Sequence, residues 1–386
     1  MNTPNHLYFQ RENDANIKES FENWRVVLLF GARQIGKTTM AEKYFESIEI
    51  PKKKIVGQDR DVQRLLRESS LSSINALIGD AQFLFIDEAQ YIPEIGTVLK
   101  LIYDTRPDVK VLATGSSAFG LVSKTSEAMT GRQISLSAFA LSVREIMNND
   151  IFDNIIFDIP QILRYGTYPK VLSTNEADRK QEILIELADA YLYKDVLEFH
   201  GIRKAPVIAK LAQMLALQIG NQVSLSELAR SLEINKATVQ SYIDVLIKSF
   251  IIFPLSTLSR NPRKELNKSM KYYFYDTGIR NAIIRNFSDL DIRNDVGALW
   301  ENFIVSEMKK RYTYDKKPFN MYHWRTYDQK EIDIVMEENG LLRAYECKYS
   351  GDSRDIRKST HEAWRSLYPD ATVGVINKTN FVSYLK

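Results

Sequence analysis

The segment Gly31–Thr38 constrains the fold more than any other part of the chain. Its sequence, GARQIGKT, fits the pattern G-x-x-x-x-G-K-[ST] and stands between the apolar run Arg25–Phe30 and a helical stretch that continues to Phe45. Glycines in such a turn let backbone N–H groups surround phosphate oxygens, and the start of the helix adds positive potential. We therefore expect the phosphates of a nucleotide to bind here. The residues expected to contact the nucleotide are Gly31, Ala32, Arg33, Gln34, Ile35, Gly36, Lys37, Thr38 and Thr39.

Four side chains near this turn have distinct expected roles. Lys37 reaches the β- and γ-phosphates, and Thr38 binds Mg²⁺. The apolar run Phe83–Ile86 ends in Asp87 and Glu88. Asp87 is expected to bind the same Mg²⁺ and Glu88 to polarise the attacking water, although two ordinary surface acids would give the same pattern.

Two further apolar runs carry candidate site residues at their ends. Val109–Thr114 ends in Thr114 and is followed by Ser116, and either hydroxyl would sense the γ-phosphate or cap a helix. Arg132 precedes the run Gln133–Leu136 and is expected to act as an arginine finger on a neighbouring subunit or to form a structural ion pair. Because strands and helices alternate through this part of the chain, we expect a mostly parallel sheet covered by helices.

Composition excludes several classes of protein. Among 386 residues there is one cysteine, Cys347, so no disulfide forms within the chain. The longest uncharged stretch, Leu211–Ser226, is too short and polar to span a bilayer, and the first residues lack an apolar signal segment. We therefore expect a cytoplasmic protein that has no membrane partner. The four histidines are scattered, so a zinc site is not expected.

The middle of the chain indicates a DNA-binding element. Ser224–Glu227 forms a capping box, and a turn at Glu233–Asn235 separates two short amphipathic helices, as in a helix-turn-helix. Residues 260–285 are rich in bases, which is typical of a segment that binds a polyanion. A solvated loop and a protein-interaction module are the alternatives. The bases are Arg260, Arg263, Lys264, Lys268, Lys271, Arg280 and Arg285.

The last part of the chain carries a second group of candidate catalytic residues. In Glu331–Met336, alternation points Asp333 to the polar face, and the next strand-like run contains Glu346 and Lys348 on one face. Carboxylate oxygens suit Mg²⁺, so Asp333 and Glu346 are expected to bind the metal. Lys348 would orient water or stabilise developing phosphate charge.

Several segments together resemble bacterial and archaeal AAA-type ATPases that carry a C-terminal restriction-endonuclease-like domain. The markers, in addition to Gly31–Thr38 and Asp87-Glu88, are Thr114–Ser117, Thr130–Arg132, Tyr165–Pro169 and Tyr193–Val196. In the last region, Asp333, Glu346 and Lys348 resemble the PD-(D/E)xK nuclease signature, with Ile332 where that signature usually has proline. Glu301, in a helix upstream, stands where this fold often has another acid.

The resemblance implies an α/β fold of four parts. These are an AAA-like P-loop ATPase core at residues 1–140, a helical lid at 141–217, a winged helix-turn-helix at 218–290 and a restriction-endonuclease-like α/β domain at 291–386. It implies a homo-oligomeric ATPase that uses ATP and Mg²⁺ to remodel, translocate on or process DNA, with a nuclease-like domain that cuts or grips it. The alternative is a nucleotide-gated switch that binds DNA or a partner and turns over little ATP.

Overall fold

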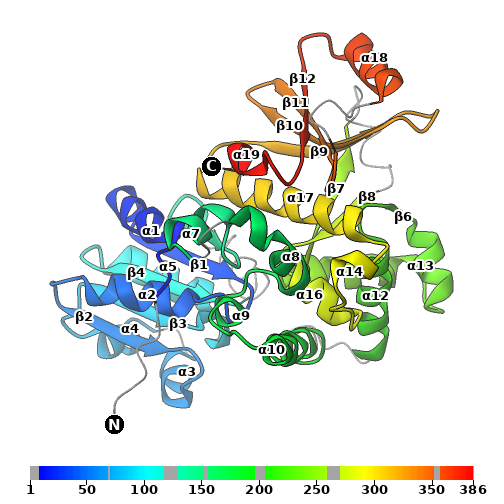
Figure 1. Cartoon of the computed structure of the whole chain (residues 1–386). Helices are drawn as coiled ribbons and strands as arrows, with labels where there is room; N and C mark the ends of the chain where they lie inside the picture. Colours follow the sequence, from blue (N-terminus) through cyan, green and yellow to red (C-terminus); the bar gives the residue numbers. More distant parts are fainter. Residues whose placement is uncertain are drawn as a thin grey trace. The chain divides into compact units, whose positions relative to one another are not determined.

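Figure 1 shows the computed structural model of the chain, which describes residues 8–67, 70–116, 129–151, 155–195, 205–258, 270–351 and 357–385. The chain divides into two compact units. The first comprises Met1–Leu141 with Lys248–Phe250, and the second comprises Ser142–Ile247 with Ile251–Lys386. The expected boundaries after residues 217 and 290 fall inside the second unit. Some residues singled out from the sequence lie outside the described residues: Ser117, Val196, Arg260, Arg263, Lys264 and Lys268.

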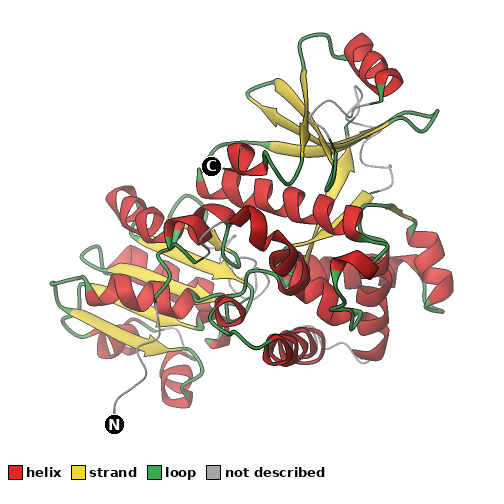
Figure 2. Ribbon diagram, viewed as in Figure 1, coloured by secondary structure: helices red, strands yellow, loops and turns green. Residues whose placement is uncertain are grey.

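A five-stranded parallel sheet, in the order β2-β3-β4-β1-β5, forms the centre of the first unit. Its strands are β1 Val26–Gly31, β2 Lys52–Val56, β3 Phe83–Asp87, β4 Lys110–Gly115 and β5 Gln133–Ala138. The accompanying helices are α1 Glu12–Asn23, α2 Lys37–Glu46, α3 Arg60–Leu66, α4 Leu71–Ile78 and α5 Ile95–Thr105 (Figure 2). The parallel sheet predicted from the alternation of strands and helices is confirmed.

The inner strands β1 and β3 are almost continuously apolar because both faces of the sheet are covered there, whereas the edge strand β2 begins with three exposed lysines. On one face, Leu28 and Leu84 join the core formed with α4 and α5. On the other face, the Phe83 ring centre lies 5.3 Å from that of Phe21 in α1 and 5.9 Å from that of Tyr44 in α2. Alternate residues of these inner strands therefore pack into opposite cores, which fixes the positions of the strand ends.

The second unit combines helices with a mixed seven-stranded sheet (Figure 2). Its first helices are α7 Val143–Asn148, α8 Ile155–Tyr165, α9 Pro169–Leu172, α10 Ala177–Asp189 and α12 Ala205–Leu217. Then come β6 Gln222–Val223, α13 Leu225–Ser231, α14 Lys236–Lys248, β7 Ile252–Thr257, β8 Met270–Phe274 and α16 Thr277–Ile283. The last elements are α17 Val296–Tyr314, β9 Asn320–Arg325, β10 Glu331–Glu338, β11 Leu341–Cys347, α18 Lys358–Leu367, β12 Thr372–Ile376 and α19 Phe381–Leu385.

The two helices expected around the turn at 233–235 are α13 and α14. The Ser224 hydroxyl accepts a hydrogen bond from the Glu227 N–H at 3.3 Å, as a helix N-cap does. Asn235 caps α14 in the same way, because its side-chain oxygen accepts the Thr238 N–H at 2.7 Å. The strands β6 and β7 both pair antiparallel with β8, so in sequence these helices lie between the first and second strands of a small sheet.

That small sheet continues into the C-terminal strands. The strand order is β12-β11-β10-β9-β7-β8-β6, and β7 pairs parallel with β9 at Ser256 and Thr257. At this seam, the Thr257 hydroxyl lies 3.0 Å from Nε2 of His323, which is fully buried. Residues on both sides of position 290 therefore share one hydrogen-bonded sheet.

Candidate functional sites

The turn between β1 and α2 has the backbone geometry that its glycines allow. A Cβ on Gly31 would lie 2.1 Å from the Ala138 carbonyl oxygen, so only glycine fits there. Gly36, directly before α2, has φ +94°, a left-handed conformation that side chains disfavour. The two glycines at the ends of the motif thus let the chain turn sharply from strand to helix.

Lys37 and Thr38 begin α2 and point toward different partners. The Lys37 ammonium is buried and donates a hydrogen bond to the Ala32 carbonyl oxygen at 2.6 Å, which holds it against the turn. The Thr38 hydroxyl donates to the Asp87 carboxylate at 2.9 Å. The structure therefore brings together the motif residues and the first acid of the Asp87-Glu88 pair.

Asp87 and Thr114 end neighbouring strands of the sheet. The Thr114 hydroxyl donates to Oδ1 of Asp87 at 2.5 Å and accepts a hydrogen bond from the Glu88 N–H at 3.1 Å. Thr38 and Thr114 thus both contact the same carboxylate oxygen. Because Asp87 is buried and bonded on two sides, its carboxylate belongs to this site, and it is not an ordinary surface acid.

Glu88 has a strained backbone and a side chain held by its neighbour. Its φ is +50°, in the left-handed region that non-glycine residues rarely adopt and that is often found at functional sites. The Gln90 side-chain amide donates to the Glu88 carboxylate, and also to the Ser116 hydroxyl at 3.0 Å. Sequence reasoning missed Gln90, since an amide two residues past an acid has no distinctive pattern.

Arg132 lies near the amino-terminal ends of the strands, whereas the motif lies at their carboxyl-terminal ends. It directly precedes β5, and Gln133 pairs with Val26 at the start of β1, whereas Gly31 is at the end of β1. Its guanidinium forms an ion pair with Asp104 at 3.5 Å. The structure therefore does not bring Arg132 to the nucleotide site of its own chain.

Thr38 and Asp87 fit the binding of Mg²⁺. A hydroxyl and a carboxylate 2.9 Å apart are hard oxygen donors, and Mg²⁺ is commonly held by one or two such groups together with substrate phosphates. When bound there, the ion would neutralise charge on the phosphates.

Asp333 and Glu346 face each other across two antiparallel strands. Ile334 pairs with Tyr345, so Asp333 on β10 stands opposite Glu346 on β11. The Asp333 carboxylate accepts the Cys347 N–H at 2.7 Å, and the Lys348 ammonium donates to the Glu346 carboxylate at 2.9 Å. Side chains directly opposite on antiparallel strands are close neighbours, so the three predicted residues lie together.

A buried lysine joins this cluster from another strand. Lys271, on β8, is 1% exposed, and its ammonium lies 2.5 Å from Glu331 and 3.1 Å from Glu301. The Tyr273 hydroxyl donates to the same Glu301 oxygen at 2.5 Å. The acid expected on the upstream helix is thus present in α17, but its partner is a cation that sequence reasoning had assigned to a DNA-binding segment. We call Asp333, Glu346, Lys348, Lys271, Glu301 and Glu331 the carboxylate cluster.

Burial and mutual repulsion raise the pKa values of three acids of the carboxylate cluster. Burial, with a further contribution from Asp333, raises the pKa of Glu346 to about 7. The same two causes raise the pKa of Glu301 to about 7. Burial also raises the pKa of Asp333. For Lys271, burial lowers the pKa, but the surrounding carboxylates outweigh it and hold the pKa above its usual value.

The carboxylate cluster opens into a pocket of about 580 Å³. Its walls include Asp333, Glu346 and Lys348 together with Lys330 and Arg357. Among the described residues, no three His, Cys, Asp or Glu side chains are grouped to hold a metal ion by themselves. Two carboxylates with solvent access still fit Mg²⁺, which usually retains several water ligands.

The described part of the basic segment, residues 270–285, is not one continuous basic surface. Within its described part, Lys271 and Arg280 are buried, and Arg280 forms an ion pair with Asp295 at 2.6 Å. Arg285 pairs with Asp189 at 2.8 Å. Lys271 and Arg280 are therefore not surface bases, because each is buried and paired with an acid.

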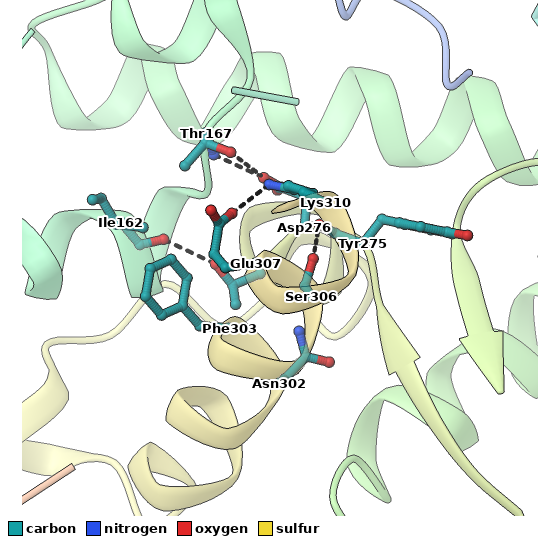
Figure 3. Close-up of a pocket in the computed structure, with 10 residues that line it drawn as sticks. Ile162, Thr167, Tyr275, Asp276, Asn302, Phe303, Ser306, Glu307 and Lys310 are labelled. Carbon is teal, nitrogen blue, oxygen red and sulfur yellow. Dashed lines mark hydrogen bonds and ion pairs between the residues drawn. The ribbon is translucent and has the colours of Figure 1, made fainter. Parts of the chain in front are cut away.

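The marker Tyr165–Pro169 has a packing role in the second unit. The Thr167 N–H donates to Asp276 at 2.7 Å, and a Cβ on Gly166 would lie 2.0 Å from the same carboxylate. Figure 3 shows Asp276 near Glu307 and Lys310, which form an ion pair at 2.6 Å, and these residues line a space of about 10 Å³. Such a space holds about one water molecule, so this marker forms a polar core and no substrate pocket.

Comparison with known families divides the chain into three matched regions. The family described as an AAA domain matches residues 23–147, which contain the parallel sheet and the nucleotide turn. The first unit has the fold of an AAA-type P-loop ATPase. This ATPase domain implies nucleotide binding. Two families described as domains of unknown function, DUF8612 and DUF4143, match residues 156–290 and 296–384.

Similar proteins extend over nearly the whole chain. An uncharacterized protein of Mycobacterium tuberculosis is 28% identical over 371 residues, covering 92% of this chain and 77% of that protein. One of Methanocaldococcus jannaschii is 22% identical over 359 residues, covering 86% and 77%. A solved structure, a Walker-type ATPase of Pyrococcus abyssi, has a TM-score of 0.50 at 17% identity and covers 72% of this chain and 96% of that chain. In the part of the chain that the structure describes, no helix is both long and apolar enough to cross a membrane.

Proposed function

We propose that the chain is a Mg²⁺-dependent ATPase that acts on DNA. The observation that carries the ATPase half is the hydrogen-bonded group of Thr38, Asp87 and Thr114 beside the buried Lys37. These residues come from α2, β3 and β4, and they meet where the strands end. Phosphate binding, metal binding and water activation are therefore possible at one place.

Each side chain has a separate task in this proposal. The Lys37 ammonium exchanges its Ala32 carbonyl partner for the β- and γ-phosphates of ATP. Thr38 and Asp87 would hold Mg²⁺, which would neutralise charge on the phosphates. The Glu88 carboxylate accepts a proton from the attacking water, while Thr114 orients the Glu88 backbone and Asp87.

The position of Glu88 favours an enzyme over a nucleotide-gated switch. Gln90 holds the Glu88 carboxylate, and Ser116 binds the same Gln90 amide. A switch that only binds ATP needs no carboxylate fixed next to the phosphate site. Turnover is therefore part of the proposal.

We infer a winged helix-turn-helix in the region α12 to β8. The order of one helix, a short strand, two helices and two strands supports it, as does the antiparallel pairing of β8 with β6 and β7. On α14, Lys236, Gln240 and Ser241 are exposed, and such side chains suit a helix that contacts DNA.

We further propose that the C-terminal region is a PD-(D/E)xK-like nuclease module. The order α17-β9-β10-β11-α18-β12 supports it, and the specific observation is that Asp333, Glu346 and Lys348 converge at one pocket. Asp333 and Glu346 would hold Mg²⁺, and Lys348 would stabilise charge that develops on the phosphate. A module that grips DNA without cutting it is the alternative.

One pair of assays tests both halves. The purified chain is incubated with ATP and Mg²⁺, with and without linear, forked and junction DNA, and phosphate release and DNA cleavage are measured. We expect ATP hydrolysis that DNA stimulates. Absence of hydrolysis with every DNA would overturn the enzyme proposal and leave the nucleotide-gated switch.

A further inference from the structure

Arg11 is a buried cation at the nucleotide turn that no motif includes. It directly precedes α1, and its side chain is 5% exposed. Its guanidinium donates one hydrogen bond to the Ile35 carbonyl at 2.7 Å and another to the Phe139 carbonyl at 2.7 Å. Arg11 therefore joins the turn to the segment that follows β5.

The Ile35 carbonyl determines where the next N–H points. A trans peptide group is planar, so the C=O of Ile35 and the N–H of Gly36 point in opposite directions. With the carbonyl held by Arg11, the Gly36 N–H points away from Arg11. Because Gly36 has no Cβ and lies at φ +94°, this peptide would reorient easily without an anchor.

We propose that Arg11 is a positioning residue of the nucleotide site, which fixes the Ile35–Gly36 peptide so that its N–H is ready for a phosphate oxygen. The ligand class is a polyphosphate, and the inference rests on the proposed nucleotide site. Arg11 forms no bond to the phosphate in this arrangement. It acts through the backbone: its two terminal guanidinium nitrogens each donate to a different carbonyl, whereas all the donors of a lysine stand on a single nitrogen atom.

Asn13 provides a matched control. It lies in the first turn of α1, is buried, and donates a hydrogen bond to the Ser137 carbonyl at 3.0 Å. Asn13→Ala therefore loosens the same contact between α1 and the β5 strand without touching the turn. Any general loss of stability appears in both variants, whereas a defect in phosphate binding appears only at Arg11.

The test compares Arg11→Met, Arg11→Lys and Asn13→Ala in the full chain, with ATP and inorganic tripolyphosphate as probes. We expect Arg11→Met to weaken binding of both by about tenfold or more, as expected for a lost hydrogen bond to a charged group. KM for ATP should rise with little change in kcat. Arg11→Lys should recover less than half of the lost affinity, and Asn13→Ala should bind both probes like the wild type.

Two results would overturn the inference. One is wild-type affinity for tripolyphosphate in Arg11→Met, and the other is an equal loss of affinity in Asn13→Ala. If Arg11→Met does not fold, Arg11→Lys decides, because full recovery would show that charge alone matters. Lys37→Ala is included to separate the two proposals: if it binds ATP as well as the wild type, the nucleotide site itself is wrong.

Discussion

The nucleotide site and the carboxylate cluster differ in how their charged side chains are paired. In the first, Lys37 is bonded to a backbone carbonyl, and the Asp87 carboxylate accepts hydrogen bonds from two hydroxyls. In the second, Asp333 and Glu346 oppose each other, and the pKa of each is raised. The nucleotide site thus presents donors suited to an anion, whereas the carboxylate cluster has excess negative charge that favours a cation. One chain therefore holds two candidate metal sites of different character.

The largest expected effect is on ATP hydrolysis, which should depend on the nucleotide site and not on the carboxylate cluster. Lys37→Ala should abolish tight ATP binding, because it removes the ammonium that holds phosphate. Glu88→Gln should bind ATP but lower kcat by about 10²–10⁴-fold, the usual contribution of a positioned base. Phosphate release and nucleotide binding measure these effects, and Asp333→Ala is the matched control in the other unit. Near wild-type turnover in Glu88→Gln would contradict the role of Glu88 as the group that activates water.

A comparable loss is expected at the carboxylate cluster, measured by DNA cleavage. With Mg²⁺ or Mn²⁺, the wild type should cut phosphodiester bonds, and Asp333→Ala should not, because a lost metal ligand costs several kcal/mol of transition-state stabilisation. ATP hydrolysis should stay intact in this variant. Equal cleavage by two preparations purified side by side would indicate a contaminant, and absence of cleavage by the wild type would leave a module that only grips DNA.

Lys271 tests whether the carboxylate cluster depends on its internal cation. Lys271→Met leaves Glu301 and Glu331 without their buried partner, and should lower the free energy of unfolding by about 3–5 kcal/mol. Lys43→Met is the control, since Lys43 is half-exposed and pairs with Asp14 at 3.2 Å. Such a surface pair is worth about 1 kcal/mol or less. Urea denaturation measures both, and equal effects would contradict the structural role of Lys271.

A smaller effect depends on pH. Because the folded-state pKa of Glu346 is about 7 against an ordinary 4.5, its contribution to stability is present below pH 4.5 and is lost as pH rises through 7. Glu346→Gln should therefore be more stable than the wild type at pH 8, by up to about 3 kcal/mol. The gain should fall toward zero at low pH.

Adding Mg²⁺ gives a second comparison between the stabilities of the wild type and Glu346→Gln. At pH 8 it should raise the melting temperature of the wild type more than that of Glu346→Gln, because only the wild type keeps both carboxylates. Equal stabilities of the two proteins at pH 8, with and without Mg²⁺, would show that the opposed carboxylates carry no excess charge.

The smallest expected signal concerns Arg132, near the amino-terminal ends of the strands in the ATPase sheet. If it serves the nucleotide site of a neighbouring copy, Arg132→Ala and Lys37→Ala should each be inactive alone. Mixed together, they should regain a fraction of the wild-type phosphate release, because some contacts pair an intact Arg132 with an intact Lys37. Full activity of Arg132→Ala alone would favour the plain ion pair with Asp104.

The nucleotide site was largely predictable because most of its residues lie in one short motif. Gly31–Thr38 contains the turn and the cation, and the acids end an apolar run, so local patterns suffice. The bond between Thr114 and Asp87 joins residues far apart in sequence, but the parallel order of strands predicts that their ends meet. Gln90 and Arg11 were missed because a hydrogen bond to a side chain or carbonyl has no local signature.

The carboxylate cluster was predictable only in Asp333, Glu346, Lys348 and, through the family resemblance, Glu301. Alternation along two strands indicated Asp333 and Glu346, since these strands adjoin in sequence. Lys271 reaches the cluster through the pairing of β7 with β8 and with β9, and this pairing follows from tertiary structure. Counting bases in a segment cannot separate a buried ion pair from a solvated charge, which is why Lys271 and Arg280 were misassigned.

The pairing between β7 and β9 also limits which parts of the gene can be exchanged separately in evolution. Ser256 and Thr257 match Tyr322 and His323 in a parallel ladder, so the two flanking regions complete each other's sheet. Gene recombination that replaced the residues after 290 with an unrelated sequence would remove β9. The strand β7 would then have an unpaired edge, which is prone to aggregation. We therefore expect these regions to descend together as a pair, while sequence change accumulates in the loops at the ends of the strands.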